Sequence, residues 1–237
     1  MRAILMAAGI GSRVSRNVQK PKSTLDVGNI SIIRHTVEML LNHGVKVAVV
    51  VGYKREDIHA ELNGLEVTYY WNPYYKVTNS MASLWFAQDF IKEDEDLLLA
   101  NADVYWDDAL YELILNDTRL SVMLSDKSRV LTGDYFFKVE DEKIVKYGKE
   151  LDVGDRSCEY VGIAKLSQSI LKKFVARLNY LVEKDMYNLW WENVLYEYAD
   201  IDSVYVRDVD GRFWAEVDYI EDYYRILSHL NLKKGEN

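Results

Sequence analysis

The sequence predicts an α/β fold with an open, mostly parallel (Rossmann-like) sheet and a small C-terminal region of a β-hairpin and helices. Short apolar runs alternate with segments of helical periodicity over residues 1–125, which is typical of a parallel sheet covered by helices. From residue 126 the pattern changes to two short runs joined by a turn. A chain of 237 residues buries a sizeable core without disulfides, so we interpret residues 1–237 as a single domain with halves 1–125 and 126–237.

The first half begins with an apolar run over residues 3–8 that ends at Gly9 and is typical of a strand buried on both faces. Ser31 can cap a helix that ends near Gly44, because Ile33, Val37, Leu40 and Leu41 then fall on one face. Further apolar and helical patterns predict strands 45–51, 65–71, 97–100 and 120–124, and helices 55–62, 80–91 and 107–115.

The second half contains two runs, 135–139 and 143–147, separated by the turn-like Glu140-Asp-Glu, which predicts a hairpin. Helices are expected over 168–183 and 189–198, strands over 203–206 and 213–217, and a closing helix from Tyr219. No internal repeat or low-complexity segment interrupts this order.

Charge and cysteine content exclude several classes of protein. The formal net charge of −9 argues against a nucleic-acid-binding protein, which needs a basic face. The single cysteine, Cys158, cannot form an internal disulfide, and no Cys and His cluster has the spacing of zinc ligands. No segment is long and apolar enough to span a membrane, and no targeting signal is recognisable. We therefore expect a cytoplasmic protein that binds neither nucleic acid nor membrane.

The N-terminal segment is an exception to the acidic composition. The first acidic residue is Asp26, and it follows five basic residues: Arg2, Arg13, Arg16, Lys20 and Lys22. A bound anion would explain this local charge, and a solvated loop is the alternative. The segment also carries Gly9-Ile-Gly11 directly after the first strand, where glycines allow backbone N–H groups to approach phosphate.

Two common glycine loops do not match. A dinucleotide-binding loop needs a third small residue and an acidic residue that closes the second strand, but Val14 and Gly52-Tyr53 occupy those positions. A P-loop needs glycine directly before its lysine, whereas Pro21 precedes Lys22. The remaining pattern is Ala7-Ala-Gly-Ile-Gly-Ser-Arg13, followed after a spacer by Pro21-Lys22.

Leu5-Met-Ala-Ala-Gly-Ile-Gly-Ser-Arg13 with Lys20-Pro-Lys22 resembles the signature of nucleoside-triphosphate transferases that act on sugar phosphates and small alcohol phosphates. The resemblance implies that residues 1–125 bind the nucleotide and residues 126–237 the acceptor. It makes Arg13 and Lys22 catalytic phosphate contacts and adds loop contacts from Ala7, Ala8, Gly9, Gly11 and Ser12. The chain lacks the Pro-Leu-Thr that many sugar-phosphate members carry between the arginine and the Pro-Lys.

Acidic residues follow two of the predicted strands. Asp103, in Asn101-Ala-Asp103, comes after the strand at 97–100, and Asp218 follows the strand at 213–217, the edge where α/β sheets bind ligands. The family has aspartates at both places, so the resemblance implies that they bind Mg²⁺ and that Ala102 lies against the nucleotide. Helix capping is the alternative role for each aspartate. Glu216 shares a face with Asp218 and is expected to be a neighbour of the ligands, with a role as a metal ligand as the alternative.

The region 72–84, with Asn79 and Ser83, resembles the corresponding part of bacterial CTP:phosphocholine cytidylyltransferases, as does Leu189-Trp-Trp-Glu-Asn193. The resemblance implies CTP as one substrate, with Gly52 and Tyr53 also near the nucleotide. The partner substrate is then a small phosphorylated or phosphonate acceptor, used to make a precursor of a cell-surface polysaccharide or phospholipid. A monomer and a homodimer are both compatible with the sequence.

The aromatic content, with 6 Trp and 18 Tyr, suits a cationic acceptor, because a quaternary ammonium group is held by ring faces and carboxylates. The alternative is that these rings fill the core. Primary-amine acceptors would suit the same pocket. The expected acceptor-binding residues are Tyr187, Trp190, Trp191, Glu192, Trp214 and Glu216.

These observations predict an enzyme that transfers a cytidylyl group from CTP to a phosphocholine-like acceptor and releases pyrophosphate. No general base is expected, because the attacking phosphate oxygen is already ionised at neutral pH. A sugar-1-phosphate nucleotidyltransferase is the nearest alternative, and a non-catalytic nucleotide-binding regulatory protein is the alternative of another class.

Overall fold

The computed structural model describes residues 1–11, 20–196 and 204–235. Over these residues the strands are β1 (Arg2–Ala7), β2 (Lys46–Val51), β3 (Val67–Trp71), β4 (Leu97–Asn101), β5 (Val104–Tyr105), β6 (Ser121–Asp126), β7 (Phe136–Glu140), β8 (Lys143–Gly148), β9 (Cys158–Leu166), β10 (Tyr205–Asp208) and β11 (Ala215–Glu216). The α-helices are α2 (Ile32–Asn42), α3 (Arg55–Glu61), α4 (Ser80–Phe86), α5 (Asp108–Leu115), α6 (Gln168–Glu183), α7 (Asn193–Tyr196) and α8 (Ile220–Gly235). Short 3₁₀ turns are η1 (Lys22–Thr24), η2 (Gln88–Phe90), η3 (Lys127–Arg129) and η4 (Val153–Asp155).

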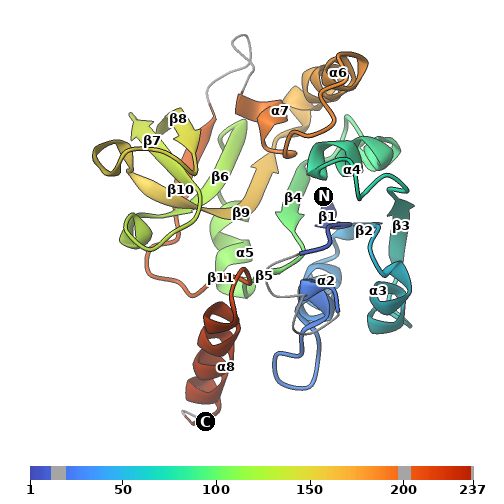
Figure 1. The fold of residues 1–237 in the computed structure, drawn as a ribbon, viewed down its shortest axis with the longest axis vertical. Helices are drawn as coiled ribbons and strands as arrows, with labels where there is room; N and C mark the ends of the chain where they lie inside the picture. The colour runs from blue at the N-terminus through green and yellow to red at the C-terminus, as the bar shows by residue number, and fades with distance from the viewer. Residues whose placement is uncertain (12–19, 197–203, 236–237) are drawn as a thin grey trace.

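The main sheet has the strand order β3-β2-β1-β4-β9-β6-β10-β8-β7 (Figure 1). β3, β2, β1 and β4 are parallel, with Leu5 paired to Val49 on one side and to Ala100 on the other. This part confirms the parallel sheet predicted from the apolar runs. The two inner strands of this part, β2 and β1, are buried on both faces, as is usual for continuous apolar strands of α/β proteins.

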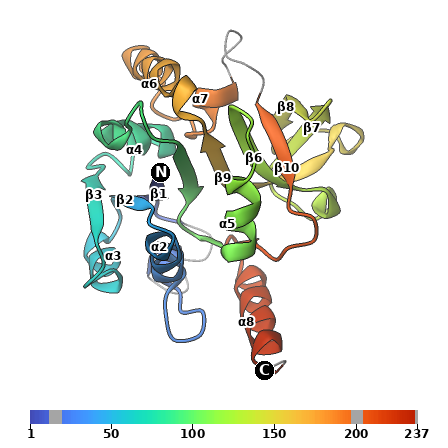
Figure 2. The same cartoon turned by 180° about the vertical axis from the view of Figure 1, so that it is seen from behind.

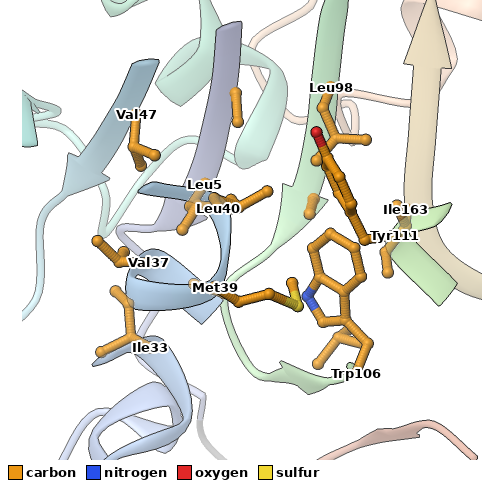
Figure 3. Close-up of a cluster of buried hydrophobic side chains, with 14 of the residues drawn as sticks. Leu5, Ile33, Val37, Met39, Leu40, Val47, Leu98, Trp106, Tyr111 and Ile163 are labelled. Atoms are coloured by element: carbon orange, nitrogen blue, oxygen red, sulfur yellow. The ribbon is translucent and has the colours of Figure 1, made fainter. Parts of the chain in front are cut away.

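Helices cover the two faces of the sheet with separate apolar clusters. On one face, alternate residues of β1 pack with side chains of α2, α3 and α5; Figure 3 shows Leu5 among Val37, Leu40 and Val47. On the other face, Ile4 belongs to a cluster with residues of α4, α6 and α7. Figures 1 and 2 show α4, α6 and α7 grouped together, with α2 and α3 below them and α8 at the lower end of the view. The described residues contain no helix long and apolar enough to cross a membrane.

β9 is the main element that the sequence analysis missed. It lies antiparallel between β4 and β6, so the complete sheet is mixed. Its apolar pattern is interrupted by Glu159, Gly162 and Lys165, yet all nine residues are buried. Glu159 pairs with Arg129, and the Lys165 ammonium donates to the carbonyls of residues 115 and 117, so both charges are satisfied inside the fold.

The C-terminal half closes on itself. β9 also pairs with β7, so the strands β9, β6, β10, β8 and β7 form a ring of neighbours. The β7–β8 hairpin was predicted and is confirmed, whereas the closure depends on the missed strand. The predicted α/β fold is confirmed: its open, parallel sheet lies in the N-terminal part, and the C-terminal region adds the closed group of strands to the same mixed sheet.

Most other elements lie near their predicted positions. Ser31 caps α2, with its hydroxyl accepting from the backbone N–H of Arg34 at 3.3 Å. The helix predicted over 80–91 ends at Phe86 and is followed by the separate turn η2. The helix predicted over 189–198 is reduced to α7. Residues 197 and 198 of that prediction, and residue 203 of the strand predicted over 203–206, lie outside the described residues.

Candidate active site

The glycine loop leaves β1 at the carboxyl edge of the parallel strands. Gly52, at the end of β2, lies against it: a Cβ at Gly52 would be 2.6 Å from the Ala8 carbonyl oxygen, and the N–H of Tyr53 donates to that oxygen at 3.0 Å. Gly11 has φ +62°, and a Cβ there would be 2.9 Å from Cγ of Lys22. The bare backbone of Gly11 therefore leaves room for the Lys22 side chain.

The two predicted metal aspartates come together through a small antiparallel pair of strands. Asp103 lies between β4 and β5, and Asp218 follows β11. β5 pairs with β11, with Glu216 opposite Val104, and the N–H of Val217 donates to the Asp103 carbonyl at 3.1 Å. These backbone contacts bring the C-terminal aspartate to the end of β4.

Lys22 lies between the two carboxylates. Its ammonium is 2.6 Å from Oδ1 of Asp218 and 3.6 Å from Oδ2 of Asp103, and its side chain is only 9% exposed. Burial opposes the charge of Lys22, but the adjacent aspartates outweigh this effect and raise its pKa. Burial, together with the nearby Asp218, raises the pKa of Asp103 despite the attraction of Lys22. In this cluster the Lys22 ammonium is the cation that stabilises the negative charges of Asp103 and Asp218.

The donor set fits a magnesium ion held jointly with a substrate. Mg²⁺ is commonly bound by one or two carboxylates, with substrate phosphates and water completing its coordination. Asp103 and Asp218 supply such a pair, and both already face the ammonium of Lys22. Among the described residues, no group of three or more His, Cys, Asp or Glu side chains is arranged to hold a metal ion. A site of this kind needs the nucleotide to complete it.

Two adjoining cavities open beside this cluster. The first, of 80 Å³, is lined by the glycine loop and η1, including Ala7, Gly9, Gly11, Lys22, Ala102 and Asp103. The second, of 180 Å³, shares Met6, Gly9 and Asp103 with the first. Its further lining includes Ala8, Asn79, Ser83, Asn101, Trp190 and Glu216. The shared residues make the two cavities parts of one cleft.

A larger cavity, of 610 Å³, lies beside α5 and is lined by charged residues. Arg119 pairs there with Asp117, and Arg207 and Arg212 both pair with Asp210. Because these arginines have acidic partners and lie away from the lysine–aspartate cluster, we place the active site in the smaller cleft.

The structure brings most predicted nucleotide-binding residues to this cleft. Residues 7, 8, 9, 11, 79, 83 and 102 line it, and Gly52 and Tyr53 support it from behind Ala8. Asn79 also caps α4, with its Oδ1 accepting from the N–H of Ser80 at 2.8 Å. The predicted contacts Ser12 and Arg13 lie outside the described residues.

Trp191 does not line the cleft, so its prediction as an acceptor contact is corrected. Its side chain is fully buried, and its indole Nε1 donates to Oδ1 of Asn101 at 2.9 Å. Trp190, its neighbour, is 41% exposed and lines the second cavity. Tyr135 packs edge-on against the Trp190 ring at 5.8 Å.

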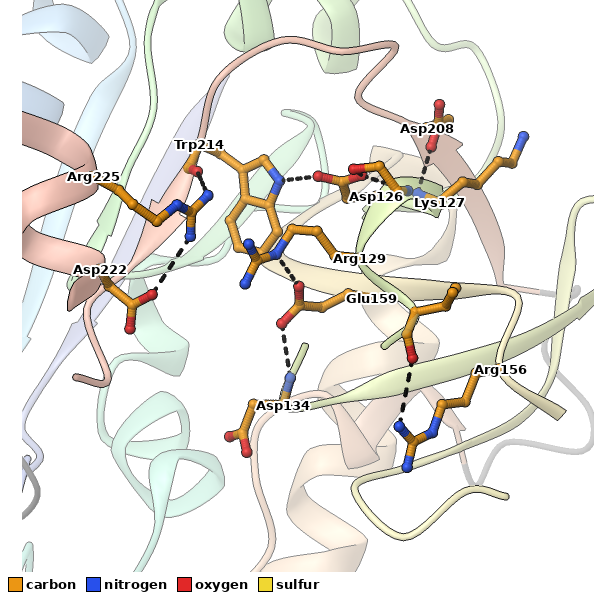
Figure 4. Close-up of polar contacts among 12 residues, drawn as sticks. Asp126, Lys127, Arg129, Asp134, Arg156, Glu159, Asp208, Trp214, Asp222 and Arg225 are labelled. Carbon is orange, nitrogen blue, oxygen red and sulfur yellow. Dashed lines mark hydrogen bonds and ion pairs between the residues drawn. The ribbon is translucent and has the colours of Figure 1, made fainter. Parts of the chain in front are cut away.

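Trp214 is also corrected. Figure 4 shows its indole directed toward Asp126, to which Nε1 donates at 2.9 Å. Arg129 lies over the ring, 5.6 Å from its centroid, and the side chain is buried. Trp214 therefore fills the core beside η3, since it belongs to a buried apolar cluster and does not line either cavity of the cleft.

Tyr187 and Glu192 also lie outside the lining of the cleft. Tyr187 borders an apolar groove with Trp85 and Phe86, and its hydroxyl donates to Asp185 at 2.6 Å, which corrects its predicted role. Glu192 is buried, and burial raises its pKa to about 8. Glu192 lies deeper than the sequence pattern predicted.

Sequence reasoning missed Asn101 and Tyr75, which both line the second cavity. Asn101 is the last residue of β4, two positions before Asp103, so its place at a strand end was the available signal. Tyr75 lies in the loop that precedes α4, and no local motif marks it.

A lysine between two carboxylates, at the edge of a parallel sheet and beside a glycine loop, defines a nucleotidyltransferase. Residues 3–129 match the model of the family described as the MobA-like NTP transferase domain, and the chain belongs to this family.

Three known proteins are similar over nearly the whole chain. The CTP:phosphoglutamine cytidylyltransferase of Campylobacter jejuni is 26% identical, over 94% of this chain and 97% of that protein. The structure of CTP:phosphocholine cytidylyltransferase from Streptococcus pneumoniae superposes with a TM-score of 0.76 at 21% identity, covering 97% of this chain and 98% of the other. UDP-glucose pyrophosphorylase of Acinetobacter baumannii gives 0.75 at 16% identity, covering 98% and 93%. The two structures share the fold.

Proposed function

We propose that the protein transfers a cytidylyl group from CTP to a small phosphorylated or phosphonate acceptor that carries an amine or quaternary ammonium group, and releases pyrophosphate. The observation that carries this proposal is the ammonium of Lys22 between Asp103 and Asp218, in a cleft formed by two adjoining cavities. The similarity to a protein named as a cytidylyltransferase, over 94% of the chain, supports the nucleotide.

The triphosphate would lie in the first cavity, against the backbone of Gly9 and Gly11. Lys22 would contact the α-phosphate, and Ser12 and Arg13 would extend the loop around the other phosphates. Asp103 and Asp218 would hold Mg²⁺, which when bound supplies positive charge to the converging phosphates. The base would lie toward Asn79 and Ser83 in the second cavity.

The reaction would be an in-line displacement at the α-phosphorus. An ionised oxygen of the acceptor forms the new P–O bond while the bond between the α-phosphorus and the bridging oxygen to the β-phosphorus breaks, and the electron pair leaves with pyrophosphate. No proton must be removed from the acceptor, so no general base is required. Lys22 then stabilises charge on the α-phosphate during the displacement.

The acceptor would enter from the Trp190 side of the cleft. Trp190 is 41% exposed, with the Lys149 ammonium 5.5 Å from its ring centroid, and Glu216 lines the same cavity. The exposed part of this ring and the carboxyl group would both contact the cation of the acceptor. Tyr135 packs against the Trp190 ring and supports it. A sugar 1-phosphate would gain nothing from the cation-binding character of this wall, although the fold itself is shared with an enzyme named for UDP-glucose.

Pyrophosphate release with a matrix of nucleotides and acceptors tests the proposal. CTP, UTP, GTP, ATP and dTTP are each paired with phosphocholine, phosphoethanolamine, 2-aminoethylphosphonate, an amino-acid-derived phosphate and glucose 1-phosphate. We expect turnover with CTP and at least one nitrogen-bearing acceptor. Activity only with hexose phosphates would refute the acceptor class, and activity with none would favour the non-catalytic alternative.

Lys22→Met provides the internal control of this assay, because it removes the charge and preserves much of the side-chain volume. Lys92→Met is the matched variant, since Lys92 is exposed and remote from the cleft. Turnover should be lost in the first variant and retained in the second. Equal turnover in both would contradict the placement of the site.

A further inference from the structure

Asn101 lies in the wall of the cleft and has both ends of its amide group engaged. The indole Nε1 of Trp191 donates to Oδ1 at 2.9 Å, and Nδ2 donates to Oε1 of Glu216 at 3.3 Å. Asn101 is the last residue of β4 and lines the second cavity beside Asp103 and Trp190. Residues from three distant parts of the chain therefore meet at one amide.

The orientation of this amide follows from the chemistry of its partners. An indole N–H only donates, so the atom that faces Trp191 must be the amide oxygen. The nitrogen then faces Glu216, whose carboxylate accepts. A flipped amide would put N–H against N–H on one side and oxygen against a carboxylate oxygen on the other. Trp191 thus determines which atoms Asn101 presents to the cleft.

Gly162 on β9 provides the space for this arrangement. It has φ +87°, and a Cβ there would be 2.9 Å from Cγ2 of Val104 and 3.2 Å from Nδ2 of Asn101. A side chain at this position would displace the amide nitrogen or its neighbour. The β9 backbone is therefore shaped to let the Asn101 nitrogen reach its position.

The amide nitrogen carries two hydrogens, and the bond to Glu216 uses one of them. The second is available to a ligand in the cavity that Asn101 lines. Because Glu216 and Asp103 also line this cavity, an anionic substrate group there needs a compensating donor. Asn101 is such a donor on the acceptor side, away from the first cavity, where Gly11 and Lys22 face the triphosphate.

We propose that Asn101 binds the acceptor by donating an N–H to its phosphate or phosphonate oxygen, and that Trp191 is a positioning residue that keeps the amide in the donating orientation. This inference rests on the proposed function and adds a specific contact to it. The buried tryptophan then acts on the substrate through Asn101 and never touches it.

Two substitutions separate this role from a structural one. Asn101→Asp keeps an oxygen for the Trp191 N–H and replaces the donor that would face the substrate by an acceptor. It also puts a carboxylate oxygen against Glu216, so we expect its melting temperature to fall. Trp191→Phe keeps an aromatic ring and removes the N–H that orients the amide, together with one ring of the buried indole. Trp85→Phe is the matched control, because the Trp85 indole also donates to an asparagine oxygen, that of Asn179 at 2.8 Å, outside the cleft.

KM and kcat are measured for acceptor and CTP, with the melting temperature of each variant. We expect Asn101→Asp to raise the acceptor KM by about 10- to 100-fold, the size expected for losing a hydrogen bond to a charged group, and to leave the CTP KM within about twofold. Trp191→Phe should raise the acceptor KM by about 3- to 10-fold, and Trp85→Phe should leave it unchanged.

An acceptor KM within twofold of wild type in Asn101→Asp, or equal increases for CTP and acceptor, would overturn the inference. If Asn101→Asp does not fold, Trp191→Phe gives the same decision from its own KM values. A phosphate or phosphonate oxygen is present both in the nitrogen-bearing acceptors and in the hexose 1-phosphates. If the wild-type protein uses only a hexose 1-phosphate, the proposed acceptor class fails, and the same comparison made with that substrate still tests Asn101.

Discussion

Replacing Glu192 by glutamine should make the protein more stable at neutral pH and have little effect in acid. Burial raises the pKa of this carboxyl from 4.5 to about 8, so the folded protein holds a proton that the unfolded chain releases above pH 4.5. The unfolded state is therefore favoured as pH rises from 4.5 to 8. Glutamine has a similar shape and carries no proton to lose.

The size of the effect follows from the pKa shift. Each pKa unit corresponds to about 1.4 kcal/mol, so the wild-type carboxyl costs about 1 kcal/mol of folding free energy at pH 5 and about 4 kcal/mol at pH 7.5. The difference in stability between Glu192→Gln and wild type should thus grow by about 3 kcal/mol over this range.

Urea unfolding at pH 5, 6, 7 and 7.5 measures this difference directly. Glu93→Gln, at an exposed position, serves as the control and should show a difference from wild type that does not change with pH. A constant difference for Glu192→Gln as well would show that the folded protein does not hold the proton. Saturating acceptor should reduce the effect if its cation lies near Glu192, because a nearby positive charge favours the ionised carboxylate.

Three further predictions concern the cleft. Lys22→Met should lower kcat by about 100- to 1,000-fold in the pyrophosphate assay with an unchanged circular dichroism spectrum, because it removes a charge placed for the transition state. Asp222 accepts from the backbone N–H of Asp218 at 3.2 Å and of Tyr219 at 2.9 Å. Asp222→Ala should therefore lower kcat about tenfold, whereas Asp222→Asn should retain most activity. Equal kcat values for these two variants would contradict this positioning. Gly162→Ala should lower the free energy of unfolding, measured by urea denaturation, by about 2 to 5 kcal/mol, because Gly162 has a positive φ and a crowded Cβ position. A loss below about 1 kcal/mol would show that β9 relaxes without strain.

The parallel part of the fold could be predicted because its information is local. The apolar runs of β1, β2 and β4 are continuous and lack the helical spacing of apolar residues, so they are not amphipathic helices. Ser31 marks the start of α2. β9 could not be found in this way, because Glu159 and Lys165 look solvent-exposed unless their distant partners are known. Its place between two strands is a tertiary property.

The site was predictable to a similar extent. Lys22, Asp103 and Asp218 could be named because strand ends and family spacing mark them. Adjacent tryptophans could not be told apart: Trp190 faces the cleft and Trp191 the core, and this depends on how the segment before α7 meets Ser80, whose hydroxyl accepts from the backbone N–H of Trp191 at 2.9 Å.

The contact between Lys22 and Asp218 joins residues that are 196 positions apart. The family match ends at residue 129, so the segment that defines the family lacks one member of the carboxylate pair. Ile226 of α8 packs in a cluster with Leu25 and Ile32, beside η1, which places the last helix against the start of the fold. During synthesis on the ribosome, the lysine is therefore made long before the second carboxylate of its pair. The contact between Lys22 and Asp218 can form only after β11 has been made and has paired with β5.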